Sequence, residues 1–316
     1  MNTKFLFIKM ILAVNLLSGL AMSSHAKLNV VATTSDFGAI AREIGDDLVQ
    51  VNVLAKPTED PHFVDPKPSY IVKLAKADIL IEGGAELEMG WLPPLIDGSR
   101  NAKIELGKPG RVLCAEGLAL LEVPATLDRS KGDIHALGNP HFMTDPINAC
   151  HAAERICDAF SALDQEHSAT YRQRLDAFNK HLDEKLVAWK KQLEPFQGKR
   201  LVAYHNSWPY FANRFGVKID LFLEPKPGIP PTPAHLAEVI TTMKRENILI
   251  IIVEPYQNMK TAETVSGKTG ATVLEFTQYP GGVQGTEGGY IELIDYLVNT
   301  LATALSKERS AEEHKP

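Results

Sequence analysis

The chain has 316 residues, a formal net charge of −6 and three cysteines. This length is sufficient for one large domain or two medium domains with real hydrophobic cores. A mildly acidic chain without clusters of Lys and Arg is not expected to bind nucleic acid or an anionic membrane surface. An odd number of cysteines does not make a disulfide framework, so we expect Cys114, Cys150 and Cys157 to be small buried side chains.

The first 26 residues have the pattern of a secretory signal peptide. Lys4 and Lys9 precede a short apolar run, and the small residues Ser24 and Ala26 stand where a cleavage site requires them. The apolar run is too short to span a membrane comfortably, and no cysteine stands directly after it to carry a lipid. We therefore expect residues 1–26 to be cleaved, which would release a periplasmic protein without a lipid anchor.

Residues 27–163 alternate between the patterns of strand and helix. Strands are expected at 28–34, 49–55 and 78–84, and helices at 36–45 and 67–77. Strands that are separated by single helices are typical of parallel βαβ units. This segment is therefore predicted to form an N-terminal α/β lobe.

A long helix is predicted over residues 164–197. Apolar residues recur there at intervals of three and four, as on one face of a helix, at Tyr171, Leu175, Phe178, Leu182, Leu186 and Trp189. A helix of this length would connect two lobes and hold them at a nearly fixed angle.

Residues 198–306 repeat the alternation and are predicted to form a C-terminal α/β lobe. Its strands are expected at 200–205, 218–223, 247–255 and 271–276. The predicted fold is therefore α/β, with two lobes that each contain a mainly parallel sheet and flanking helices, joined by one long backbone helix. The polar tail at 307–316 is expected to be disordered.

One histidine lies in a short, stiff loop, "GNPHFMTDP", at residues 138–146. Pro140 restricts the backbone that enters His141. Asp145 is a good N-cap, and Pro146 suits the first turn of the helix that should follow.

Two further histidines occupy comparable places. His62 follows the second expected strand in a proline-rich loop, and His205 ends the strand "LVAYH". Ligands of parallel α/β sheets bind beyond the carboxyl ends of the strands, so His62, His141 and His205 can converge on one cleft. Three imidazoles suit zinc and leave one coordination position to fill. Unrelated loop histidines are the alternative that the residues alone leave open.

Taken together, these stretches resemble the metal-binding solute-binding proteins of bacterial zinc and manganese ABC importers. The similarity follows the chain in order through "VVATTSDFGAIAREIGDD", "DPHFVDPKPSYIVKLAKADILIEGG", "GNPHFMTDPINA", "VAYHNSWPYFANRFG", "EPKPGIPPTPAHLAEVI" and "IIVEPYQ". The resemblance implies two α/β lobes joined by a rigid helix, with one metal ion in the cleft. It also implies that His62, His141 and His205 are the ligands.

The sequence departs from this family in two places. Many members supply a carboxylate ligand in a segment of the type "FTD", where this chain has "FTQ". Gln278 is therefore the candidate fourth ligand and Glu254 a weaker one, with a water or another side chain as the alternatives. The histidine-rich loop that is common in zinc-specific members is missing. His135 stands near its place and is the one candidate there for capturing metal.

Three imidazoles without a carboxylate favour Zn²⁺ over Mn²⁺, while Cu²⁺ would bind at least as tightly. The predicted function is a periplasmic zinc carrier, expected to be a monomer, that delivers its ion to an ABC permease. A manganese or copper carrier is the first alternative. A zinc hydrolase with Glu254 or Glu59 as its base is another, although nothing else in the sequence is arranged for a reaction. A surface adhesin would need an anchor, which we do not expect here.

Overall fold

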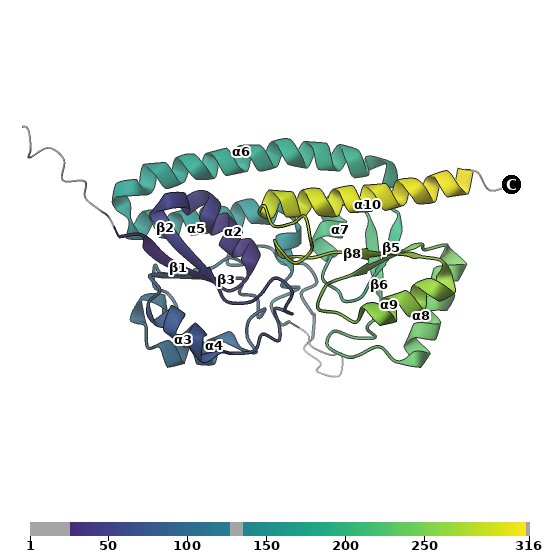
Figure 1. Ribbon diagram of the computed structural model, residues 1–316, viewed down its shortest axis with the longest axis horizontal. Helices are drawn as coiled ribbons and strands as arrows, with labels where there is room; N and C mark the ends of the chain where they lie inside the picture. The colour runs from purple at the N-terminus through teal and green to yellow at the C-terminus, as the bar shows by residue number, and fades with distance from the viewer. Residues whose placement is uncertain (1–25, 127–134, 314–316) are drawn as a thin grey trace, which may run out of the picture.

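The computed structural model describes residues 26–126 and 135–313, and in it two α/β lobes lie side by side beneath one long helix (Figure 1). The predicted fold class is confirmed. The expected signal peptide falls almost wholly in residues 1–25, outside the described residues, as do 314–316.

Each lobe contains a four-stranded parallel sheet. The N-terminal sheet has the order β2-β1-β3-β4, with β1 at Leu28–Ala32, β2 at Val49–Val53, β3 at Ile79–Glu82 and β4 at Arg111–Leu113. The C-terminal sheet has the equivalent order β6-β5-β7-β8, with β5 at Arg200–Ala203, β6 at Lys218–Phe222, β7 at Ile250–Val253 and β8 at Thr272–Glu275. All seven predicted strands are present. The prediction missed β4 because three residues are too few to show a periodicity.

The helices begin where the sequence provides suitable first residues. They are α2 at Ser35–Gly45, α3 at Pro68–Ala75, α4 at Leu92–Ser99, α5 at Pro146–Leu163, α6 at Ser168–Leu193, α7 at Pro209–Phe215, α8 at Pro233–Glu246, α9 at Met259–Thr269 and α10 at Tyr290–Glu313. Proline stands in the first turn of α3, α4, α5, α7 and α8, where its missing N–H costs no hydrogen bond. The Asp145 carboxylate accepts from the Ile147 N–H at 2.9 Å, which confirms the predicted cap of α5.

The two faces of each sheet pack against different cores. In β1, Val30 and Ala32 face a core that extends through both lobes, whereas Val31 faces a smaller core under α3 and α4. In β5, Ala203 faces the shared core and Val202 faces a separate core under α8 and α9. Successive side chains of a strand point to opposite faces of the sheet. The two cores therefore show that helices cover both faces of each sheet.

The shared core makes the two lobes parts of one body. It includes side chains of α2, α5, α6, α7 and α10 together with the inner faces of both sheets. Helix α6 has 26 residues, a length of about 39 Å at 1.5 Å per residue, and it runs along both lobes (Figure 1). Its six predicted apolar residues are all buried. The predicted long helix between the two lobes is therefore present, and it packs along its length against the shared core.

Polar side chains of α6 add ties at both of its ends. Arg174 donates to the Gly45 carbonyl and to Asp47 of the N-terminal lobe, at 2.8 Å in each case. Trp189 donates through Nε1 to Asp295 of α10 at 2.7 Å. These bonds attach one helix to both lobes.

The predicted disordered tail at 307–316 is wrong for residues 307–313. Helix α10 continues to Glu313, and Lys199 pairs with Glu308 at 2.9 Å. The polar composition of this segment reflects a solvated helix that is anchored by its apolar residues upstream. The three cysteines are free thiols, of which Cys150 is only partly buried.

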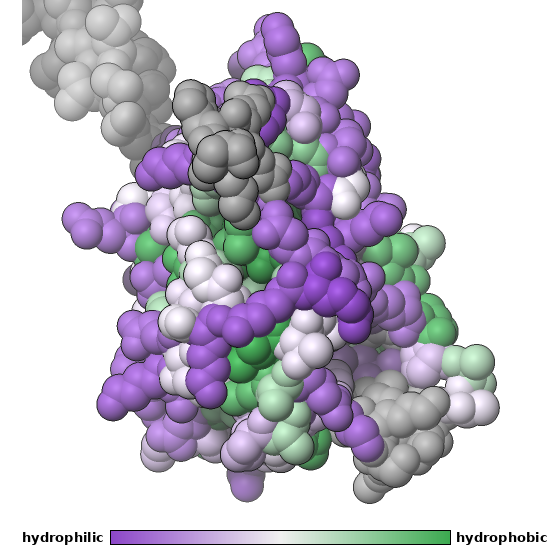
Figure 2. Space-filling model, turned by 90° about the vertical axis from the view of Figure 1, so that its right-hand side faces the viewer, coloured by the Kyte–Doolittle hydropathy of each residue, from purple (hydrophilic) through white to green (hydrophobic). Residues whose placement is uncertain are grey.

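The end of the molecule drawn in Figure 2 is mostly hydrophilic. Figure 2 looks onto the end of the molecule formed by the C-terminal lobe and shows apolar side chains only in small groups between polar ones. Among the described residues, every helix is either too short or too polar to pass through a membrane.

Candidate metal centre

The three predicted histidines come together between the lobes. His62 lies in the loop after β2, His141 in the loop before α5, and His205 two residues after β5. One ring nitrogen of each lies within 4.8 Å of the other two. His62 Nε2 and His141 Nε2 are 3.3 Å apart. Two nitrogens that each lie 2.0–2.1 Å from a tetrahedral zinc ion would be about 3.3 Å apart, so this spacing fits one shared ion.

Burial keeps two of these histidines neutral. It lowers the pKa of His62 and of His141 well below the ordinary value, and the neighbouring imidazoles lower it further. His141 is only 3% exposed. A neutral imidazole is the form that binds metal, so protons compete little at these two positions.

His205 has a carboxylate partner that the sequence analysis did not identify. His205 Nδ1 lies 2.7 Å from Oε2 of Glu224, which follows β6. Burial alone would lower the pKa of His205, but the hydrogen bond and the charge of Glu224 outweigh it and raise the pKa. Such a partner fixes the proton on Nδ1 and turns Nε2 toward an ion. The sequence contained one signal for this partner. Glu224 follows β6, and β6 pairs with β5, the strand that precedes His205.

The loop that carries His141 is held from the C-terminal lobe. Tyr210 of α7 donates to the Asn139 carbonyl at 2.7 Å, and the Asn139 amide donates to the Asn206 carbonyl at 2.9 Å. Asn139 Oδ1 also accepts from the His141 N–H at 3.0 Å. The stiffness that Pro140 suggested therefore comes largely from contacts across the interface between the lobes.

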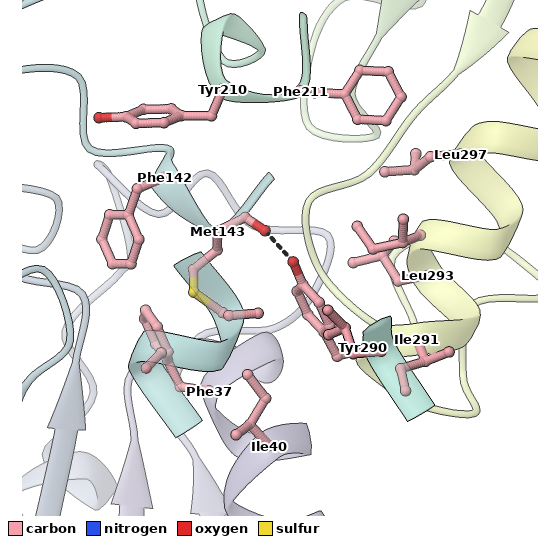
Figure 3. Packing of buried hydrophobic residues seen from close by; sticks show 14 of the residues in the cluster. Phe37, Ile40, Phe142, Met143, Tyr210, Phe211, Tyr290, Ile291, Leu293 and Leu297 are labelled. Carbon is pink, nitrogen blue, oxygen red and sulfur yellow. Dashed lines mark hydrogen bonds between the residues drawn. The ribbon is translucent and has the colours of Figure 1, made fainter. Parts of the chain in front are cut away.

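Two more bonds close this loop on its other side. Arg214 of α7 forms a bidentate ion pair with Asp145, at 2.7 and 2.8 Å. Tyr290, at the start of α10, donates to the Met143 carbonyl at 2.7 Å, and Figure 3 shows this bond among the side chains of the shared core. The loop of His141 therefore bridges the lobes, because it leads into α5 beside the N-terminal sheet and is bonded to α7 and α10.

Gln278 lies beside His141, three residues after the end of β8. Its side chain is 5% exposed, and its Nε2 donates to the Tyr256 hydroxyl at 3.1 Å. It lies close enough to the His141 ring to oppose part of the lowering of the pKa of that histidine. Glu254, the weaker candidate, is fully buried and accepts from Trp208 Nε1 at 3.0 Å. Burial raises its pKa to about 7. Within the described part of the chain, the donor cluster contains the three histidines and not Glu254.

His135 stacks on His62, with ring centroids 5.0 Å apart, but it lies outside the donor cluster. Its neighbour Ala136 donates its N–H to Glu86 at 2.5 Å. Both histidines line a cavity of about 240 Å³ that also contacts His205 and Glu224. Glu59, the base that a hydrolase would need, accepts from the Lys56 N–H at 2.8 Å and so closes a turn.

The model of the family described as zinc-uptake complex component A, periplasmic (ZnuA), matches residues 30–304. This chain belongs to the ZnuA family. Members of the family are metal-binding solute-binding proteins of ABC importers and not enzymes, which excludes the hydrolase alternative. They act outside the cytoplasm together with a membrane permease.

Similar proteins differ in the metal that their names give. The iron-binding protein YfeA of Yersinia pestis is 28% identical over 87% of this chain and 86% of its own length. The manganese ABC transporter substrate-binding lipoprotein PsaA of Streptococcus pneumoniae is 24% identical over 96% of this chain and 97% of its own. Because PsaA is a lipoprotein, the expected absence of a lipid anchor gains no support from the relatives.

Solved structures agree in fold. A crystal structure of ZnuA superimposes with a TM-score of 0.75 at 23% identity, covering 88% of this chain and 99% of that one. The Mn-bound periplasmic metal-binding protein of Candidatus Liberibacter asiaticus gives 0.72 at 22% identity, covering 89% and 100%.

Replacing Arg214 tests whether the loop of His141 depends on its ion pair. Arg214→Met removes the ion-pair partner of the Asp145 carboxylate, and the Asp145 side chain is only 7% exposed. We expect a loss of about 3 kcal/mol in the free energy of unfolding and weaker metal binding, measured by urea denaturation and chelator competition. Arg245→Met removes an exposed arginine as the control. Equal stability of the two variants would contradict the assignment.

Replacing Glu224 tests the role of the carboxylate beside His205. In the wild type the raised pKa of His205 lets protons compete with metal as the pH falls toward and below that pKa. Glu224→Gln should lower this pKa, so that metal affinity changes less between pH 8 and pH 6. At pH 8 the affinity should fall about tenfold because the imidazole loses its orienting partner. A steeper pH dependence in the variant would refute this role.

Proposed function

We propose that this protein is the zinc carrier of its importer, with His62, His141 and His205 as ligands and the Gln278 amide oxygen as the fourth. The observation that carries the proposal is the convergence of three imidazole nitrogens in a donor cluster without a carboxylate, among the residues described. Imidazole suits Zn²⁺, whereas Mn²⁺ prefers oxygen ligands and higher coordination numbers. The 3.3 Å spacing of two of these nitrogens supports a small tetrahedral ion.

The surroundings of the centre support transport of the ion. The cavity of about 240 Å³ gives a path between solvent and two of the three histidines. We propose that His135, stacked on His62 beside this cavity, is an auxiliary ligand that captures metal on its way in. The carrier would then deliver the ion to its permease as a periplasmic monomer, after cleavage behind Ala26.

Metal titration of the stripped protein tests the zinc assignment. We expect one tight equivalent of Zn²⁺ in competition with a chelator, and Mn²⁺ binding at least 100-fold weaker, since each tenfold step is about 1.4 kcal/mol and the donors are nitrogen-rich. His141→Ala should abolish tight binding, while His151→Ala, a histidine outside the donor cluster, should leave it unchanged.

The outcomes separate the possible cargoes. Manganese bound as tightly as zinc would contradict the zinc assignment and indicate an oxygen-rich site, as would suit a carrier of the PsaA type. Copper is expected to bind at least as tightly as zinc in vitro. Rescue of a carrier-deficient strain under zinc starvation, and not under copper starvation, therefore completes the test.

A further inference from the structure

The side chain of Tyr256 contacts the one proposed ligand that is not a histidine. Tyr256 lies in the loop after β7, and its hydroxyl accepts from Gln278 Nε2 at 3.1 Å. The Gln278 side chain also lies close enough to the His141 ring to oppose part of the lowering of the pKa of that histidine. The amide is thus held through its nitrogen on Tyr256, which leaves its oxygen as the free end near His141.

The charges around Tyr256 favour this direction of the hydrogen bond. The hydroxyl lies in the field of Asp60 and of Glu254, which is charged above its raised pKa of about 7. Negative charge draws the hydroxyl hydrogen toward it and leaves an oxygen lone pair for the amide N–H of Gln278. With the amide reversed, its NH₂ group would face the histidines, and an amide nitrogen is no ligand for a divalent cation.

We propose that Tyr256 is a positioning residue that presents the amide oxygen of Gln278 to the bound divalent cation. The proposal rests on the function proposed above and concerns only the fourth ligand. A carboxylate at this position could bind through either oxygen, so it would not need a partner to choose its orientation. A neutral amide has one suitable atom, and the phenol fixes which atom faces the ion.

Removing the hydroxyl has a defined consequence. Tyr256→Phe leaves the Gln278 N–H without its acceptor, in a side chain that is only 5% exposed. The amide then rotates or withdraws, and the three histidines bind the ion with water as the fourth ligand. We expect Zn²⁺ affinity to fall about tenfold, the usual effect of one lost hydrogen bond.

A double-mutant cycle tests the assignment, with Tyr256→Phe, Gln278→Ala and the double variant each titrated with Zn²⁺. If Tyr256 acts through Gln278, its tenfold effect is present in the wild-type background and absent beside Gln278→Ala. Tyr296→Phe is the control, because its hydroxyl donates to the Glu275 carbonyl in the same lobe and not to the Gln278 side chain. Thermal melting of each metal-free variant checks that the fold is retained.

The visible spectrum of the Co²⁺-loaded protein supplies a readout that a purely structural role would not move. We expect the ligand-field bands to shift in the same direction in Tyr256→Phe and Gln278→Ala, and to stay unchanged in Tyr296→Phe. Unchanged bands in Gln278→Ala, or an equal loss of affinity for Tyr256→Phe in both backgrounds, would overturn the proposal. Failure of the wild type to bind any metal tightly would refute the proposed function instead.

Discussion

The bonds that hold the loop from Asn139 to Asp145 against the C-terminal lobe are the constraint on which the centre depends. Three imidazoles can share an ion only if their nitrogens are held a few ångströms apart, and here two lobes must supply them. Tyr210, Arg214 and Tyr290 fasten the loop of His141 to the lobe that also carries His205. The shared core and helix α6 then fix where His62 arrives.

The chemistry of the centre follows from its lack of charge. His141 is buried and His62 partly buried, their surroundings lower both pKa values, and the fourth candidate is an amide. Two nearby carboxylates are hydrogen-bonded to other side chains. Glu224 contacts His205, and Glu254 accepts from Trp208. Glu224 orients His205, and neither carboxylate belongs to the donor cluster of the described residues. An arrangement of this kind favours an ion that accepts nitrogen ligands over one that requires several anionic oxygens.

The sequence predicted the lobes, seven strands and the three histidines because these depend on local patterns. Hydrophobic periodicity marks a strand or helix, and a histidine beyond a strand end has its place decided by the parallel topology. The partners of those histidines depend on tertiary contacts. Tyr256 and Gln278 are separated by 22 residues, and Asp145 and Arg214 by 69. No local pattern links such pairs. Strand β4 was missed because three residues are too few to show a periodicity, and the helical end of α10 was missed because packing of its upstream residues decides it.

X-ray absorption at the zinc edge of the loaded protein tests the central claim most directly. The account predicts four nitrogen and oxygen ligands at about 2.0–2.1 Å, with the scattering pattern of three imidazoles, and a change at the single oxygen in Gln278→Ala. Five or six ligands, or fewer than three imidazoles, would contradict it.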